Sequence, residues 1–153
     1  MEKHNEKQIK YDNMYMDLAK RISRMSYAVR LQVGAICVKD GRIISMGWNG
    51  TPANFDNCCE NKVCMIDAPP SNVLVTKPEV IHAEQNAIFK LARDGESGKN
   101  STMYCTHAPC TECSKGIIQT GIVRVVYAET YRVTDGIDLL HKAKIQVDKL
   151  PDP

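Results

Sequence analysis

Two short stretches of the chain carry the residue types of a tetrahedral zinc site. His82 begins the stretch His-Ala-Glu, and Cys110 and Cys113 lie in the stretch Pro-Cys-Thr-Glu-Cys. Imidazole and thiolate groups are common zinc ligands, and a structural zinc site is closed by four protein ligands. Three protein ligands leave one position for a water molecule, whose pKa zinc lowers to about 7. These residues therefore predict a catalytic zinc site that activates water.

Glu84 is the acidic residue nearest to this set of ligands. It lies two residues after His82, which is too close for both side chains to chelate one ion comfortably from the same helical turn. A carboxylate held beside the metal is better placed to move protons between water and a nitrogen of the substrate. Glu84 is thus predicted to be the general acid and base.

The ends of two helices are expected to face the metal. If His82 and Cys110 each begin a helix, the unpaired N–H groups and the positive ends of both helix dipoles favour thiolate over thiol. Cys110 and Cys113 are three residues apart and therefore share one helix face. A Cys-x-x-Cys pair alone is also typical of thioredoxin-like redox proteins, but the upstream His-x-Glu and the proline before the first cysteine favour zinc.

The spacing of apolar residues predicts the elements that hold these ligands. Helical periodicity over residues 82–93 ends at Asp94 and Gly95, and Pro109 begins a second helix that runs to Thr120 before Gly121. Strands are predicted at 102–106, 123–127 and 145–150, with another helix at 136–144. The order strand, helix, strand favours parallel crossover connections in this half of the sheet.

The first half of the chain predicts a helix, a hairpin and a long loop. Residues 1–10 are polar and non-periodic, typical of a polar frayed terminus or of the lead-in to the helix predicted over 12–25. Apolar runs at 33–38 and 42–47 flank a turn and predict a β-hairpin. Residues 51–80 predict a long loop or insertion, which is too long for an idle connection.

This loop contains Cys58, Cys59 and Cys64. They are either ligands of a second metal ion or free and buried thiols. Adjacent cysteines are awkward ligands for one ion and no histidine partner is evident, so free or buried thiols are favoured.

Composition limits the class of protein. A chain of 153 residues is long enough for one domain, here residues 1–153, and its net charge of +2 is too small to argue for nucleic acid or an anionic membrane as partner. The sequence has no secretory signal, no apolar run near 18 residues, and an odd number of cysteines, seven. These features predict a cytoplasmic protein with reduced thiols.

The His-Ala-Glu and Pro-Cys-x-x-Cys stretches resemble the signature of the zinc-dependent nucleobase deaminases. Within that superfamily, the Gly-Trp-Asn-Gly-Thr-Pro segment at 47–52, the Asn-Cys-Cys insertion and the Tyr-Arg pair at 131–132 resemble the deoxycytidylate (dCMP) deaminases. The resemblance implies a three-layer α/β/α sandwich with a five-stranded mixed sheet. It also implies hydrolysis of dCMP to dUMP and ammonia, which supplies dUMP for thymidylate synthesis. In the implied mechanism, zinc-bound hydroxide attacks C4 of the cytosine ring, and Glu84 protonates N3 and then the departing amine.

The resemblance assigns the zinc ligands to His82, Cys110 and Cys113, the general acid and base to Glu84, a sugar contact to Asn49, and a substrate contact to Ala83. A monophosphate also needs cations or N–H donors, for which the candidates are Arg30, Arg132 and Ser26, while Tyr131 is expected to stack on or border the base.

Regulation and assembly are implied by resemblance alone. In that family dCTP with Mg²⁺ activates, dTTP inhibits, and the subunits form hexamers. The effector site is then expected in the 47–60 loop, at Trp48, Gly50 and Asn57. Two other functions stay open for the same zinc set. An adenosine deaminase acting on transfer RNA is expected to have a more basic surface and a shorter loop before His82, and a non-catalytic zinc-stapled nucleotide sensor would not need Glu84.

Overall fold

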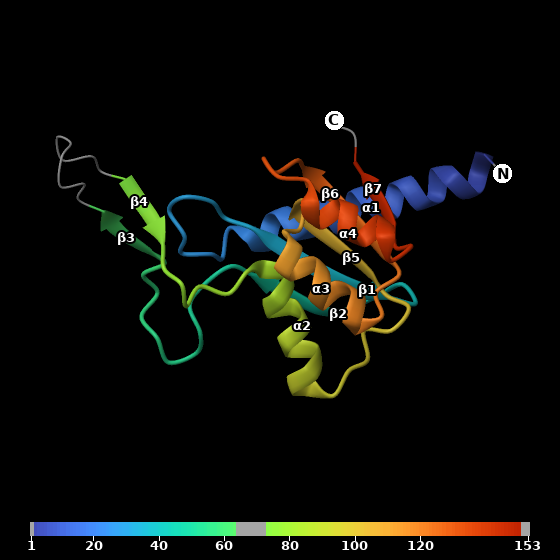
Figure 1. The fold of residues 1–153 in the computed structure, drawn as a ribbon. Coiled ribbons are helices and arrows are strands. Elements are labelled where there is room, and N and C mark those ends of the chain that lie inside the picture. The colour runs from blue at the N-terminus through green and yellow to red at the C-terminus, as the bar shows by residue number, and fades with distance from the viewer. Residues whose placement is uncertain (1, 64–72, 151–153) are drawn as a thin grey trace.

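The computed structural model describes residues 2–63 and 73–150 (Figure 1). Its elements are α1 (Glu2–Ser23), β1 (Gly34–Lys39), β2 (Arg42–Trp48), β3 (Glu60–Val63), β4 (Val73–Thr76), α2 (Ala83–Asp94), β5 (Thr102–His107), α3 (Thr111–Thr120), β6 (Arg124–Glu129), α4 (Asp135–Lys142) and β7 (Gln146–Lys149). Among the described helices, none is both long and apolar enough to cross a membrane.

Five strands form one mixed sheet in the order β2-β1-β5-β6-β7. The hairpin strands β1 and β2 are antiparallel, and β1 is also antiparallel to β5. The pairs β5–β6 and β6–β7 are parallel, which confirms the predicted crossovers. Because parallel strands end at the same edge, the segments that follow β5 and β6 emerge side by side.

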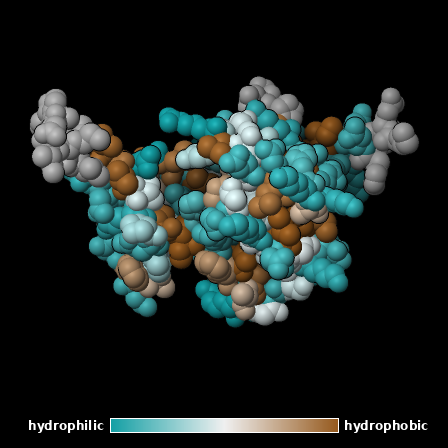
Figure 2. Space-filling view, viewed as in Figure 1, coloured by the Kyte–Doolittle hydropathy of each residue, from teal (hydrophilic) through white to brown (hydrophobic). Residues whose placement is uncertain are grey.

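Alternate residues of the sheet face two helical layers. On one side, Ile36 and Tyr104 pack against Tyr15 and Met16 of α1. On the other side, the core includes the strand residues Ala35, Cys37, Met103 and Val125, together with Ala87 and Leu91 of α2, Ile117 of α3 and Leu140 of α4. The predicted α/β/α sandwich is therefore confirmed (Figure 1). Figure 2 shows hydrophilic side chains interspersed with apolar ones on the face that carries α3 and α4.

A buried ion-pair network fastens α1 to the sheet. The Asp12 carboxylate accepts hydrogen bonds from Arg124 Nη1 and Nη2, both at 2.8 Å, and from the Tyr104 hydroxyl at 2.7 Å. Arg124 Nε donates to Asp148 Oδ2 of β7 at 2.7 Å. Burial alone raises the pKa of Asp12, but the hydrogen bonds from Arg124, Tyr104 and Gln8 hold that pKa below its ordinary value. The carboxylate is therefore ionised in the folded protein at neutral pH.

The structure refines two sequence predictions in the first half of the chain. The helix α1 begins at Glu2, so residues 2–10 are its first turns and not a frayed terminus. Here Gln8 Nε2 donates to Asp12 Oδ1 at 2.9 Å, which ties the polar turns to the buried network. The 51–80 segment is not an irregular loop throughout, because β3 and β4 pair antiparallel in a separate two-stranded sheet. We call these two strands the arm; it projects from the body at the left of Figure 1.

The arm is anchored to the body at its base. Lys77 N–H donates to the Cys59 carbonyl at 2.8 Å, and Gly50 and Ile81 exchange two backbone hydrogen bonds. Cys59 is buried and Cys58 is exposed, and both are free thiols. Neither belongs to a group of three possible metal ligands among the described residues, and Cys64 lies outside those residues.

Candidate metal centre

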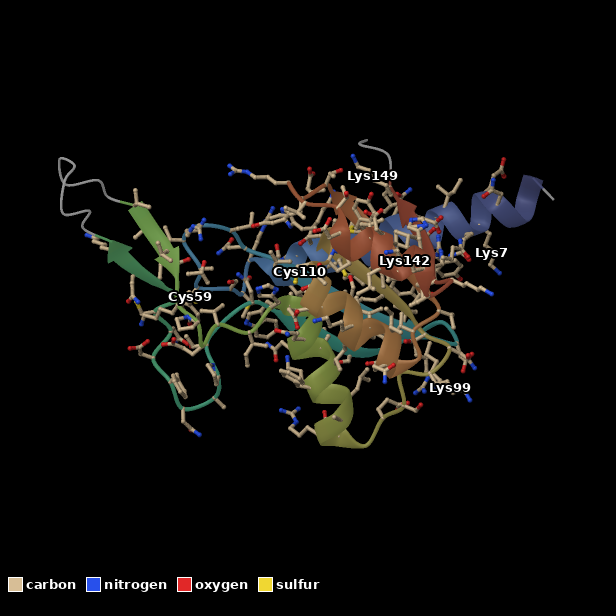
Figure 3. The ribbon with its side chains drawn as sticks, viewed as in Figure 1. Lys7, Cys59, Lys99, Cys110, Lys142 and Lys149 are labelled. Atoms are coloured by element: carbon tan, nitrogen blue, oxygen red, sulfur yellow. The ribbon has the colours of Figure 1, made fainter. Side chains whose placement is uncertain are left out.

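The metal ligands occupy the N-terminal ends of two helices. His82 is the N-cap of α2 and Cys110 is the N-cap of α3, both with extended backbone dihedral angles. Cys110 is labelled in Figure 3. Its Sγ also accepts a hydrogen bond from Cys113 N–H, so a thiolate caps the helix. The unpaired N–H groups of both helices therefore face the ligands, as the sequence predicts.

The three ligand atoms are close enough to hold one ion. His82 Nδ1 lies 3.5 Å from Cys110 Sγ and 3.3 Å from Cys113 Sγ. All three atoms lie within 4.8 Å of one another. Zinc bonds of about 2.1 Å to nitrogen and 2.3 Å to sulfur, at a tetrahedral angle, place such atoms about 3.6 Å apart. The donor set and its spacing therefore fit Zn²⁺.

The charges of these groups suit a cation. Hydrogen bonds from Cys113 and His82 lower the pKa of Cys110 to about 3. The same thiolate raises the pKa of His82 by hydrogen bonding, and raises the pKa of Cys113, which shares a proton with it. A divalent cation held by these three residues would replace the shared protons and would keep both sulfurs as thiolates.

Glu84 lies beside the ligands, in the first turn of α2, and is only 4% exposed. Burial raises the pKa of Glu84 to about 6. A carboxyl group with a pKa near neutrality both accepts and returns a proton readily. The structure therefore places a group suited to proton transfer beside the predicted zinc.

A cavity of about 370 Å³ opens in front of the ligands. Its lining includes the ligands His82 and Cys110, together with Glu84 and five of the predicted substrate contacts, which are Arg30, Asn49, Ala83, Tyr131 and Arg132. Its size lies at the lower end of the range for small-molecule sites. The parallel pair β5–β6 explains why Tyr131 and Arg132 lie near Cys110, because the two segments leave the same edge of the sheet.

Ser26, which was predicted as a phosphate contact, is not among the residues that line the cavity, and its predicted role stays a prediction. Ser26 is buried. Its hydroxyl donates to the Asn49 carbonyl at 2.7 Å and accepts from Ala28 N–H at 3.1 Å. The hydroxyl is therefore used to fix the loop that follows α1.

The Asn49 side chain lines the cavity but also has backbone partners. Its Oδ1 accepts from Val33 N–H at 2.8 Å, and its Nδ2 donates to the Leu31 carbonyl at 2.8 Å. Each end of the amide retains capacity for one further hydrogen bond. Asn49 therefore shapes the cavity wall in addition to any contact with a ligand.

The three predicted effector residues are not among those that line this cavity. Trp48 packs under the Lys90 ammonium group, which is 4.5 Å from the ring centroid. Gly50 pairs with Ile81, and the Asn57 carbonyl accepts from the Cys59 thiol at 3.7 Å. Their predicted role in effector binding is untested and stays a prediction.

Sequence reasoning gave no role in substrate binding to His107, which also lines the cavity. The Thr106 hydroxyl accepts from Gly34 N–H at 3.1 Å and so has its proton free for His107 Nδ1, at 3.0 Å. Burial lowers the pKa of His107, which favours the neutral ring. The neutral ring carries one N–H donor and one acceptor nitrogen, so His107 can exchange a hydrogen bond with a ligand in the cavity. The sequence signal that could have indicated this role is the position of His107, three residues before Cys110 and at the end of a strand.

Gly136 keeps the metal segment close to α4. A Cβ atom at this position would overlap the carbonyl groups of Pro109 and Cys110. We expect Gly136→Ala to displace this segment at a cost of about 1–3 kcal/mol, and to weaken zinc binding about tenfold. Competition with a chromogenic chelator measures this affinity. Gly116→Ala on α3 is the matched control, because its Cβ would meet only Ile88 Cδ1 at 3.4 Å. Equal zinc affinity in both variants would contradict the expected role of Gly136.

Comparison with known proteins agrees with this geometry. Residues 9–129 match the cytidine and deoxycytidylate deaminase zinc-binding region. The deoxycytidylate deaminase of Saccharomyces cerevisiae is 37% identical over 82% of this chain, which spans only 39% of the yeast protein. The deoxycytidylate deaminase of phage T4 is 34% identical, with 89% of this chain and 88% of the phage protein covered.

A solved structure shows the same likeness in three dimensions. The dCMP deaminase of cyanophage S-TIM5, crystallised with dCMP and dUMP, superposes with a TM-score of 0.81 at 45% identity, covering 92% of this chain and 97% of the phage chain. The matched region includes all three converging ligands and Glu84. The fold, the zinc-type donor set and the matched sequence agree, and the chain belongs to the zinc-binding cytidine and deoxycytidylate deaminase family.

Proposed function

We propose that this protein hydrolyses dCMP to dUMP and ammonia. The observation that carries the proposal is one cavity, lined by residues of a zinc-type ligand set, by a buried carboxylate and by two arginines, Arg30 and Arg132. The first group suits removal of an amino group from a base, and the second suits a phosphate. The relatives named for dCMP support the same substrate.

The zinc ligands are His82, Cys110 and Cys113, and bound zinc supplies a Lewis acid that makes water nucleophilic near neutral pH. The Glu84 carboxylate takes a proton from water and delivers it to N3 of the cytosine ring. The water oxygen forms a bond to C4. Glu84 then carries the second proton, from the new hydroxyl group, to the amino nitrogen, and the bond between C4 and this nitrogen breaks to release ammonia. Burial of Glu84 keeps this proton transfer away from bulk water.

The remaining lining residues orient the nucleotide. Arg30 and Arg132 bind the 5′-phosphate, and Tyr131 borders the base. Asn49 and Ala83 contact the nucleoside along the cavity wall. His107 exchanges a hydrogen bond with the substrate from the cavity wall.

The proposed activity predicts loss of the cytosine absorbance when zinc-loaded protein is mixed with dCMP. Metal analysis before the assay should give one zinc per chain. The assay itself should then form dUMP and an equimolar amount of ammonia. Removal of zinc by a chelator should abolish the reaction, and added zinc should restore it. Absence of turnover by the zinc-loaded protein would overturn the proposal and favour adenosine in transfer RNA or another amino-base as substrate.

Regulation is proposed on the same family basis. We expect dCTP with Mg²⁺ to activate the protein and dTTP to inhibit it. Both triphosphates are expected to bind the 47–60 loop at Trp48, Gly50 and Asn57. We also expect the subunits to form a hexamer, and the reaction to supply dUMP for thymidylate synthesis. Initial rates at low dCMP, with and without each triphosphate, test the effectors, and light scattering tests the hexamer. Rates that respond to neither triphosphate at any dCMP concentration would exclude this regulation.

A further inference from the structure

The arm contributes directly to the cavity that holds the proposed substrate. Glu60 of β3 and Thr76 of β4 both line this cavity. The two residues are directly opposite each other in the antiparallel pairing of the arm. They form the pair nearest its base, where Lys77 N–H is bonded to the Cys59 carbonyl. One pair of residues in the arm therefore faces the site.

Glu60 binds the backbone of the segment that carries Arg30. Its Oε1 accepts hydrogen bonds from Val29 N–H at 2.9 Å and from Arg30 N–H at 3.1 Å. This segment lies between α1 and β1 and has no regular secondary structure. Hydrogen bonds to an ionised carboxylate are stronger than bonds between neutral groups. Glu60 therefore fixes where the Arg30 side chain leaves the backbone.

Thr76 fixes the other end of the same residue. Arg30 Nη1 donates to Thr76 Oγ1 at 3.0 Å. A guanidinium group has five N–H donors in a planar fork, so a single bond to a hydroxyl leaves the others available for a ligand. An exposed arginine without such a contact would lose about 2 kcal/mol of rotamer entropy on binding. The contact with Thr76 reduces this cost in advance.

We propose that Glu60 and Thr76 are positioning residues that hold Arg30 for the 5′-phosphate, so that the arm is part of nucleotide recognition. The inference rests on the proposed function, because it takes dCMP as the substrate. A phosphate monoester offers the paired oxygens that a fixed guanidinium binds with two parallel hydrogen bonds. The arm thus distinguishes a nucleotide from a nucleoside without contacting the base.

The test compares dCMP with deoxycytidine, which lacks the phosphate. Thr76→Val keeps the shape of the side chain but removes the acceptor. We expect it to raise KM for dCMP about five- to tenfold, to leave kcat for dCMP within about twofold, and to leave kcat/KM for deoxycytidine unchanged. Glu60→Ala should behave in the same way. Thr76→Ser, which retains the acceptor oxygen, should remain close to wild type. Glu60→Gln, which keeps an acceptor oxygen but loses the charge, should lie between wild type and Glu60→Ala.

A double variant distinguishes positioning of Arg30 by Thr76 from an effect of Thr76 that does not act through Arg30. In an Arg30→Gln background, Thr76→Val should cause no further loss, because the residue on which it acts has been removed. Lys62→Gln, an exposed change on the same strand, is the control for the arm itself. Equal losses on both substrates, or a full additional loss in the Arg30→Gln background, would overturn the proposal.

Binding of dUMP and deoxyuridine, measured by calorimetry, provides a readout that does not need turnover. Thr76→Val should weaken dUMP about five- to tenfold and leave deoxyuridine unchanged. If the wild-type protein turns over dCMP but these variants do not change the preference for the phosphate, only this inference fails. If the wild-type protein does not turn over dCMP, the proposed function fails. An unchanged dUMP affinity in Thr76→Val would then overturn this inference as well.

Discussion

Replacing Glu84 with glutamine is expected to leave zinc bound and to lower kcat for dCMP by about 10²–10⁴-fold. Glutamine has nearly the same shape as glutamate but neither accepts nor returns a proton at neutral pH. Since Glu84 lies outside the three converging ligand atoms, the metal content should remain at one zinc per chain. Steady-state rates and metal analysis of the same preparation measure the two effects separately.

The matched control is Glu112→Gln, in the first turn of α3 and thus also close to the ligands. Glu112 is exposed and pairs with Lys115 at 2.6 Å. Its loss should change kcat by less than about twofold, because exposed ion pairs contribute little. Substantial turnover by Glu84→Gln, with zinc bound, would show that another group moves the protons.

The second large effect is on stability, at Asp12. Asp12→Asn removes the charge that pairs with Arg124, whose side chain is 15% exposed. Breaking a buried ion pair from one side costs about 3–5 kcal/mol, because the remaining charge is left uncompensated. Asp148 offsets part of this cost, since it also binds Arg124. We therefore expect a loss of about 3 kcal/mol in the free energy of unfolding, measured by urea denaturation.

The effect of Asp12 should depend on pH in one direction. The folded-state pKa of Asp12 is lowered from its ordinary value of 3.8. Its contribution to stability is therefore complete above the ordinary pKa and is lost as the pH falls through the lower folded-state pKa. The difference between wild type and Asp12→Asn should be constant from about pH 6 to 8 and should shrink below about pH 4. Asp17→Asn, an exposed change on the same helix, is the control, and equal losses for both variants would contradict the assignment.

The sequence was sufficient to predict the main sheet and the metal ligands because both depend on short-range patterns. His82 and Glu84 lie within one helical turn, as do Cys110 and Cys113, and their spacing follows from helix geometry alone. The parallel strands followed from the order strand, helix, strand.

Short-range patterns did not predict the strands of the arm or the first turns of α1. The strands β3 and β4 have four residues each, and their stability depends on pairing across the chain rather than on an apolar pattern. Gln8, in the part of α1 that was not predicted, joins a network whose partners, Asp12 and Arg124, are 112 residues apart. Residue spacing carries no information about such a contact.

The same limit applies to the substrate contacts. Ser26 has the right chemistry for a phosphate, but its hydroxyl is used by Asn49, 23 residues away. Glu60 was not selected because an acidic residue does not suggest a role near a phosphate. Its position matters through the backbone N–H groups of Val29 and Arg30, which only the folded chain brings to it.

The two faces of the sheet carry different features of the protein. The Asp12 network and α1 lie on one face, whereas α2 and α3, which carry the zinc ligands, lie on the other. The side chains of Tyr15 and Met16 under α1 therefore lie across the sheet from the zinc ligands. A programme to adapt this enzyme to higher working temperatures should begin on the α1 face, where gains in heat tolerance need not be exchanged for catalytic rate.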